Sequence, residues 1–140
     1  MLSHIKMGWA AEFADVGPLV TRVVVGIIFV VHGWMKVGMG IAGTAGFLTS
    51  LGIPAASVFA VLLIIGEVVG GIALIVGVGT RFWASVGVII SLVALFTVHL
   101  SNGFLISNGG YEFILLIGAV MVSLIVMGAG KYSVDAKLGM

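Results

Sequence analysis

Residues Ala56–Gly77 read ASVFAVLLIIGEVVGGIALIVG, an apolar run whose single charged side chain is Glu67. A helix of about 20 predominantly apolar residues is long enough to cross the hydrocarbon core of a bilayer. Three further apolar segments occur along the chain, at Pro18–Val37, Phe82–Leu100 and Glu112–Gly128. The sequence therefore predicts an all-α membrane protein, a bundle of four transmembrane helices.

The composition excludes several other classes of protein. The chain is 61% hydrophobic and 8% charged, whereas about a quarter of the residues in a soluble domain are charged. It has no cysteine, which excludes thiol redox chemistry, disulfides and thiolate metal ligands. The net charge of +1 gives no reason to expect nucleic acid as a partner. The first apolar segment is too long for a typical signal-peptide core, so we expect a retained anchor.

Three regions are expected: an interfacial segment at 1–17, a four-helix membrane domain at 18–130 and a tail at 131–140. Gly38 to Pro54 forms a Gly-rich connection with room for a short helical turn at Thr44–Leu51. Gly66 and Gly70 predict close approach of a neighbouring helix to the second span. The N-terminal segment has apolar residues at helical spacing, which predicts an amphipathic helix in the membrane interface: Leu2, Ile5, Trp9, Phe13 and Val16.

The basic residues predict an orientation in the membrane. Short loops rich in lysine and arginine stay on the cytoplasmic side. Both termini are therefore expected in the cytoplasm, and the 38–55 and 101–111 connections outside. The basic residues on the side of the N-terminus are Lys6, Arg22, Arg81, Lys131 and Lys137, and Lys36 lies on the other side.

Five ionisable side chains within or beside the apolar spans are His32, Lys36, Glu67, His99 and Glu112. A charge at the centre of a membrane helix costs about 2.5–3.5 kcal/mol on insertion scales. The topology places all five in the outer half of the bundle, with Glu67 deepest, about 17 Å along its helix. We expect His32, Glu67 and His99 to form a candidate polar site, and Lys36 and Glu112 to form an ion pair at its rim.

A second ion pair is expected at the opposite end of the bundle. Arg22 lies near the inner end of the first span, to which the Ser133–Asp135 stretch should return. An Arg22–Asp135 pair would hold the C-terminal tail there, in a structural role.

The outer polar cluster is compatible with several functions. A quinone needs hydrogen-bond donors and a route for protons, which histidine and a buried carboxylate supply. A scaffold or assembly subunit would instead use the same groups as ion pairs between helices. A small oligomeric transporter would use Glu67 as a proton or cation relay.

Haem and metal binding are disfavoured. His32 lies about 5 Å deeper than His99 at helical rise, so the two make a poor pair of axial haem ligands. His32, Glu67 and His99 have metal-ligand chemistry but no local spacing motif, and no metal site is predicted.

The order and spacing of several motifs resemble the DoxX family of small four-span bacterial membrane proteins. The resemblance runs from about Gly17 to Leu138, although the outer loops lack the charged stretch common in the family. It implies an accessory subunit of a respiratory or redox complex in the bacterial inner membrane, at most quinone-linked and not itself catalytic. Its partners would be other membrane subunits or further copies of the chain. The motifs are Arg22, Gly26, Phe29 and His32-Gly-Trp-Met-Lys36, Gly52-Ile-Pro54, Glu67-Val-Val-Gly70-Gly71 and Gly77, His99 and Gly103-Phe104, Gly110-Tyr-Glu112, Gly128-Ala-Gly130 and Ser133-Val-Asp135.

Overall fold

The computed structural model describes residues 8–140, and throughout that range it contains helices and turns but no strand. This confirms the all-α prediction. The helices are α1 (Gly8–Glu12), α2 (Val16–Ser50), α3 (Ala56–Val76), α4 (Thr80–Ala94), α5 (Glu112–Met127) and α6 (Val134–Leu138). Helix α4 continues through a π-helical turn, η1 (Leu95–His99), and a 3-10 turn, η2 (Leu100–Asn102); a second 3-10 turn, η3 (Ile106–Asn108), lies in the following loop.

Three helical stretches are long and apolar enough to cross a membrane: α2, α3 and the continuous stretch Thr80–Asn102. Helix α5 is equally apolar in character but has only 16 residues, fewer than the roughly 20 of a typical span. These helices correspond to the predicted spans. Of the predicted interfacial helix, only Gly8–Glu12 is helical as α1, and the part of that prediction on residues 1–7 lies outside the described range.

Helix α2 is broken at Gly40. This residue has φ 74° and ψ 167°, a conformation in the region that glycine adopts without steric penalty. Helical structure resumes at once and runs to Ser50, so the predicted connection after Val37 is largely helical. The second half of α2 packs on the start of α3 through a small apolar cluster of Ala45, Leu48 and Ala60.

Glycines set the distances between the helices. A Cβ on Gly71 would lie 2.7 Å from the carbonyl oxygen of Gly26, and the reverse contact is equally close. On the other side of α3, a Cβ on Gly70 would lie 2.7 Å from the ring of Trp83 in α4. Helix α3 is therefore in near-backbone contact with α2 and tightly packed against α4, as small residues allow in membrane bundles.

The main apolar core joins all four long helices. It contains Val25 and Phe29 of α2, Leu74 of α3, Ala84 of α4, and three residues of α5, Ile117, Met121 and Leu124. Many other large apolar side chains are exposed, as expected of helices whose outer faces meet lipid rather than water.

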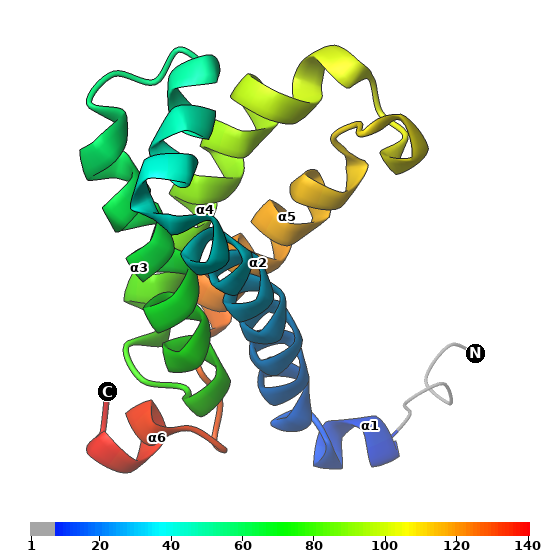
Figure 1. Ribbon diagram of the computed structural model, residues 1–140. Helices are drawn as coiled ribbons and strands as arrows, with labels where there is room; N and C mark the ends of the chain where they lie inside the picture. The colour runs from blue at the N-terminus through cyan, green and yellow to red at the C-terminus, as the bar shows by residue number, and fades with distance from the viewer. Residues whose placement is uncertain (1–7) are drawn as a thin grey trace.

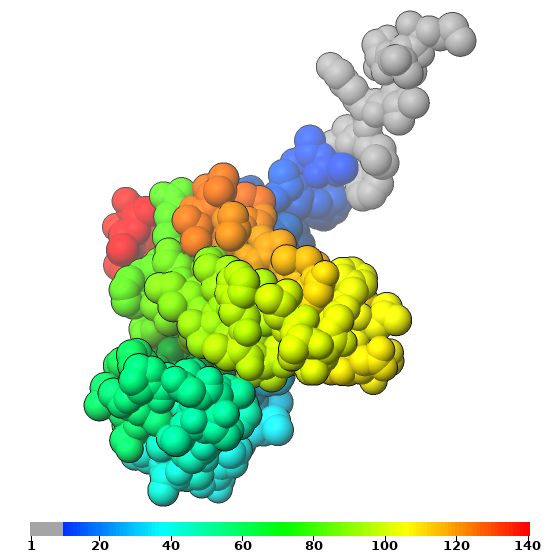
Figure 2. Space-filling view, turned by 90° about the horizontal axis from the view of Figure 1, so that it is seen from above, coloured from blue at the N-terminus to red at the C-terminus, as the bar shows by residue number. Residues whose placement is uncertain are grey.

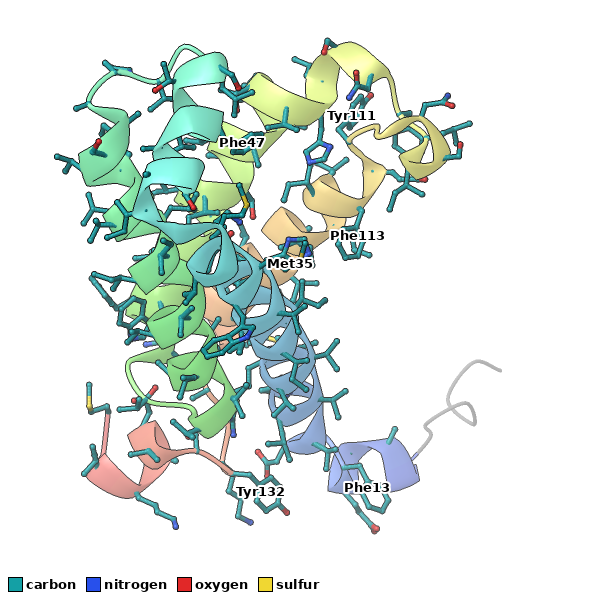
Figure 3. The ribbon with its side chains drawn as sticks, in the orientation of Figure 1. Phe13, Met35, Phe47, Tyr111, Phe113 and Tyr132 are labelled. Carbon is teal, nitrogen blue, oxygen red and sulfur yellow. The ribbon has the colours of Figure 1, made fainter. Side chains whose placement is uncertain are left out.

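The ends of the bundle differ (Figure 1). Helices α1 and α6 lie at one end, here called the terminal end, and the 51–55 and 103–111 connections lie at the other, here called the loop end. At the loop end, the second half of α2 with the start of α3 lies apart from the α4–α5 connection (Figure 2). Aromatic side chains mark both ends: Phe13 and Tyr132 lie at the terminal end, and Phe47 and Tyr111 towards the loop end (Figure 3).

We expect Gly71→Ala to destabilise the bundle by about 1–3 kcal/mol, because the added methyl group would overpack the contact with α2. Gly118→Ala in α5 is the matched control, since its Cβ would lie at an ordinary 3.6 Å from Ser91. Thermal unfolding in a mild detergent, followed by tryptophan fluorescence, measures both. Equal effects of the two substitutions would contradict the close approach of α2 and α3.

Candidate functional site

Glu67 is buried at the interface between α2 and α3. It is the twelfth residue of α3, and 6% of its surface is exposed. Opposite it, α2 carries Gly33, whose added Cβ would lie 2.9 Å from the Cβ of Glu67. Because α2 comes this close, the Glu67 side chain points into the bundle, as the sequence predicted from the glycines around it.

Lys36 neutralises this carboxylate. Its Nζ lies 3.0 Å from Oε1, to which it donates a hydrogen bond, and 2.8 Å from Oε2 of Glu67. The exposed fractions of the two side chains are 17% and 8%, so the lysine is the more accessible partner. Among the described residues, Oε2 accepts no hydrogen bond. Met35, adjacent to Lys36 in the sequence, lies about midway between the two ends of the bundle (Figure 3).

The break in α2 lies one turn beyond the ion pair. Gly40 interrupts the helix, and a buried hydroxyl compensates in part, because Thr44 Oγ1 donates to the carbonyl oxygen of Lys36 at 3.2 Å. Thr44 is fully buried and was not singled out from the sequence. The signal that points to it is the Gly-rich stretch around Gly40, where a helix in lipid needs side chains to replace lost backbone bonds.

The predicted rim pair of Lys36 and Glu112 is not formed, because Lys36 pairs with Glu67. Glu112 instead folds back over the preceding loop, where its Oε1 accepts a hydrogen bond from the backbone N–H of Ile106 at 2.6 Å. Two helices that share only a membrane depth need not face each other. Glu112 starts α5, and at the loop end this helix belongs to a different part of the bundle from α2 and α3.

The two histidines of the predicted site are not held together with Glu67. His32 is exposed on α2, one helical turn before Lys36, and its carbonyl oxygen lies 3.5 Å from Lys36 Nζ. His99 ends the π-helical turn, and its Nδ1 is 2.8 Å from the carbonyl oxygen of Gly109 in the α4–α5 loop. The structure therefore joins Lys36 with Glu67, leaves the His32 side chain exposed one turn away on α2, and leaves His99 in a loop contact. Residues 8–140 contain no group of three histidine or acidic side chains placed to bind a metal.

Arg22 joins helix ends at the terminal end of the bundle. Its guanidinium is buried and donates to the carbonyl oxygens of Ala129 at 3.1 Å and Leu74 at 3.0 Å, and also to those of Ile75 and Tyr132. Carbonyl groups at helix C-termini lack partners within their helix. One side chain of α2 therefore satisfies carbonyl groups at the end of α3 and in the connection between α5 and α6.

Asp135 is not in a direct ion pair with Arg22, in contrast to the sequence-based expectation. Its carboxylate accepts hydrogen bonds from the backbone N–H groups of Gly79 at 2.7 Å and Thr80 at 2.9 Å, at the start of α4. Burial opposes ionisation of Asp135, but these hydrogen bonds and the nearby Arg22 charge outweigh it and hold its pKa below the usual 3.8. Hydrogen bonds to the backbone N–H groups of Gly79 and Thr80 therefore hold the tail in place. Such bonds cannot be read from a pattern of side chains.

We expect Lys36→Met to lower the stability of the protein by about 3–5 kcal/mol, because it leaves Glu67 buried without a counter-charge. Glu67→Leu should have an effect of the same sign by stranding the lysine. The double variant Lys36→Met/Glu67→Leu should recover at least half of the loss, which thermal unfolding of all three proteins measures. Lys131→Gln, at an exposed lysine of the tail, is the control, and losses that simply add in the double variant would show that the two residues do not act as a pair.

Comparisons with known proteins agree with this fold. The DoxX family model matches residues 17–100. The chain is 34% identical over 113 residues to a Bacillus subtilis (strain 168) protein named "Putative oxidoreductase CatD", a match covering 79% of each chain. It is 32% identical over 127 residues to "Inner membrane protein YqjF" of Escherichia coli (strain K12), covering 91% of this chain and 95% of that protein. No solved structure matches the chain. Since the family model covers more than half of the chain, the protein belongs to the DoxX family.

Proposed function

We propose that this protein is an accessory subunit of a respiratory or redox membrane complex in the bacterial inner membrane, and that it contacts a quinone through Lys36, Glu67 and His32. The observation that carries the proposal is the Lys36–Glu67 pair at mid-membrane depth, with contacts of 2.8 and 3.0 Å. Placing ionisable groups at mid-membrane depth costs free energy, and such groups are common at functional sites. The names of the two relatives, "Putative oxidoreductase CatD" and "Inner membrane protein YqjF", support a redox role in that membrane.

The geometry suits a head group arriving from the bilayer. His32 is exposed on α2, so a quinone diffusing in the lipid meets it first. Lys36 is the more accessible member of the ion pair, and its ammonium group has three donors, of which Glu67 needs one or two. A quinone carbonyl can accept a hydrogen bond from the remaining donor, while Glu67 holds the ammonium group in place from the buried side.

Quinone reduction at this site requires a partner subunit as the source of electrons. Reduction of a quinone to a quinol takes two electrons and two protons, and in this proposal a redox centre of the partner supplies the electrons. His32 and the Lys36–Glu67 pair hold the head group and pass the protons, because imidazole and a carboxylate exchange protons readily when suitably placed. The protein itself is then a quinone-positioning subunit rather than the enzyme.

Quinone binding is measured by titrating the purified protein in detergent with a short-chain ubiquinone or menaquinone analogue and following tryptophan fluorescence, to which Trp34, an exposed residue two positions before Lys36, contributes. We expect wild-type binding, and a Kd raised about tenfold in His32→Leu, which removes a hydrogen-bonding partner of the head group, and in Glu67→Gln, which removes the charge that holds Lys36 in place. His99→Gln is the control, because His99 contacts Gly109 instead.

The scaffold alternative predicts a different pattern. If the ion pair only ties α2 to α3, the wild-type protein binds no quinone analogue, and Glu67→Gln lowers yield or co-purification of partner subunits. That outcome would replace the quinone proposal.

A second candidate function is transport, which the break in α2 favours. Interrupted helices beside a charged pair at mid-membrane depth are typical of ion-coupled transporters, and Gly40 lies one turn beyond Lys36. In this reading Glu67 is a proton or cation relay in an oligomer. Proton or cation flux in liposomes containing only this protein, abolished by Glu67→Gln, would support transport over a redox role.

The proposed orientation has both termini in the cytoplasm, supported by the excess of lysine and arginine at the terminal end. Since the chain has no cysteine, single cysteines report on each side. Cysteine at Ser107, in η3, should react with an impermeant maleimide in intact spheroplasts, whereas cysteine at Lys137, in α6, should react only after permeabilisation. The reverse pattern would invert the orientation.

A further inference from the structure

The connection between α4 and α5, residues 103–111, has no part in the proposed function. Contacts between the two helices fix its level, because the helices run antiparallel with one residue of α4 facing one residue of α5. Continuing this register places Glu112, the first residue of α5, opposite Thr97 of the π-helical turn. The 2.8 Å contact of His99 Nδ1 with the Gly109 carbonyl oxygen has the same register. The pairs that define it, through an added Cβ on the glycine, are Gly128 with Arg81, Gly87 with Met121 and Gly118 with Ser91.

Helix α5 is shorter than the bilayer core is thick. Its 16 residues span about 24 Å at helical rise, against about 30 Å for the hydrocarbon core. The stretch Thr80–Asn102 has 23 residues and spans about 34 Å. Because the two are level at the terminal end, α5 stops about 10 Å short of the end of the α4 stretch, and the connection fills that difference. Figure 1 shows the connection at the side of the bundle, lower than the top of the α4 stretch.

The backbone of the connection is bonded to the start of α5. The Tyr111 N–H donates to the carbonyl oxygen of Gly103 at 3.0 Å, and the Glu112 N–H to that of Phe104 at 2.9 Å. The Glu112 carboxylate in turn accepts from the Ile106 N–H at 2.6 Å. Irregular backbone is not tolerated in hydrocarbon unless the protein satisfies its polar groups. These bonds allow the connection to lie at the edge of the hydrocarbon, with its remaining polar groups towards the head groups.

The side chains of this region suit the boundary between acyl chains and head groups. Between Arg81 and Glu112 the sequence has no lysine, arginine, aspartate or glutamate. The ring of Phe104 packs edge-on against that of Tyr111, with 5.4 Å between the centroids, and aromatic side chains are enriched at this boundary. Four large apolar side chains are 45–55% exposed: Leu100, Phe104, Leu105 and Ile106.

A bilayer explains these observations together, whereas a protein partner does not. A partner could cover the apolar side chains but would leave the short α5 without an explanation. We propose that residues 103–111 form an interfacial loop that lies in the bilayer at the loop end, with Leu105 and Ile106 among the acyl chains. The polar Ser107 and Asn108 then lie among the head groups, within reach of water-soluble reagents.

The test measures the depth of single cysteines, which the cysteine-free chain allows. Leu105→Cys and Ile106→Cys proteins carry an environment-sensitive fluorophore and are reconstituted into phosphatidylcholine vesicles with iodide on both sides. We expect blue-shifted emission, quenching by a lipid spin-labelled high on its acyl chain, and little quenching by iodide. Ser50→Cys, at an exposed position next to the other connection at this end, is the matched control. It should show the reverse, because α3 has 21 residues and is long enough to span the core.

A charged variant tests the depth of the loop without moving the label. Leu105→Asp in the Ile106→Cys protein should restore quenching by iodide, because a short charged side chain costs free energy among acyl chains. Ser50→Asp in the same protein should leave quenching unchanged, and circular dichroism checks that both variants are folded. Equal iodide quenching of the labels at positions 105 and 50 would overturn the proposal. The loop would then stand in water, with the bilayer thinned around α5 or the apolar side chains left for a protein partner.

Discussion

The contact between α2 and α3 is the constraint on which the rest of the structure depends. Gly26 and Gly71 bring the two backbones together, and Gly33 continues this close approach to the level of Glu67. In lipid, such packing replaces the hydrophobic driving force that holds soluble helices together. Because α2 is held against α3 here, Lys36 lies within 2.8 Å of the Glu67 carboxylate. The ion pair therefore forms because glycines allow α2 and α3 to pack closely.

The two ends of the bundle are organised by different chemistry. At the terminal end, Arg22 binds four carbonyl oxygens and Asp135 binds two N–H groups, so charged side chains satisfy helix ends and fix α6 in place. At the loop end, α2 breaks at Gly40 and α4 passes into a π-helical turn. Departures from regular α-helix cost backbone bonds, and they often mark functional positions. The break at Gly40 lies one turn beyond Lys36 of the candidate site.

The sequence by itself determined the helices and their approximate limits, because apolar runs of membrane length have few alternatives to helix in lipid. It also determined that Glu67 faces the bundle, through the small residues around it. It placed His32, Glu67 and His99 in the outer half of the bundle but did not determine the rotation of each helix about its axis. Depth follows from counting residues, whereas the partner of a side chain depends on helix rotation and on which helices diverge.

Only the tertiary structure decided that Lys36 meets Glu67 and that Glu112 and His99 close a loop. It also decided that Arg22 and Asp135 bind backbone groups, because the free carbonyls and N–H groups they satisfy leave no trace in the side-chain sequence.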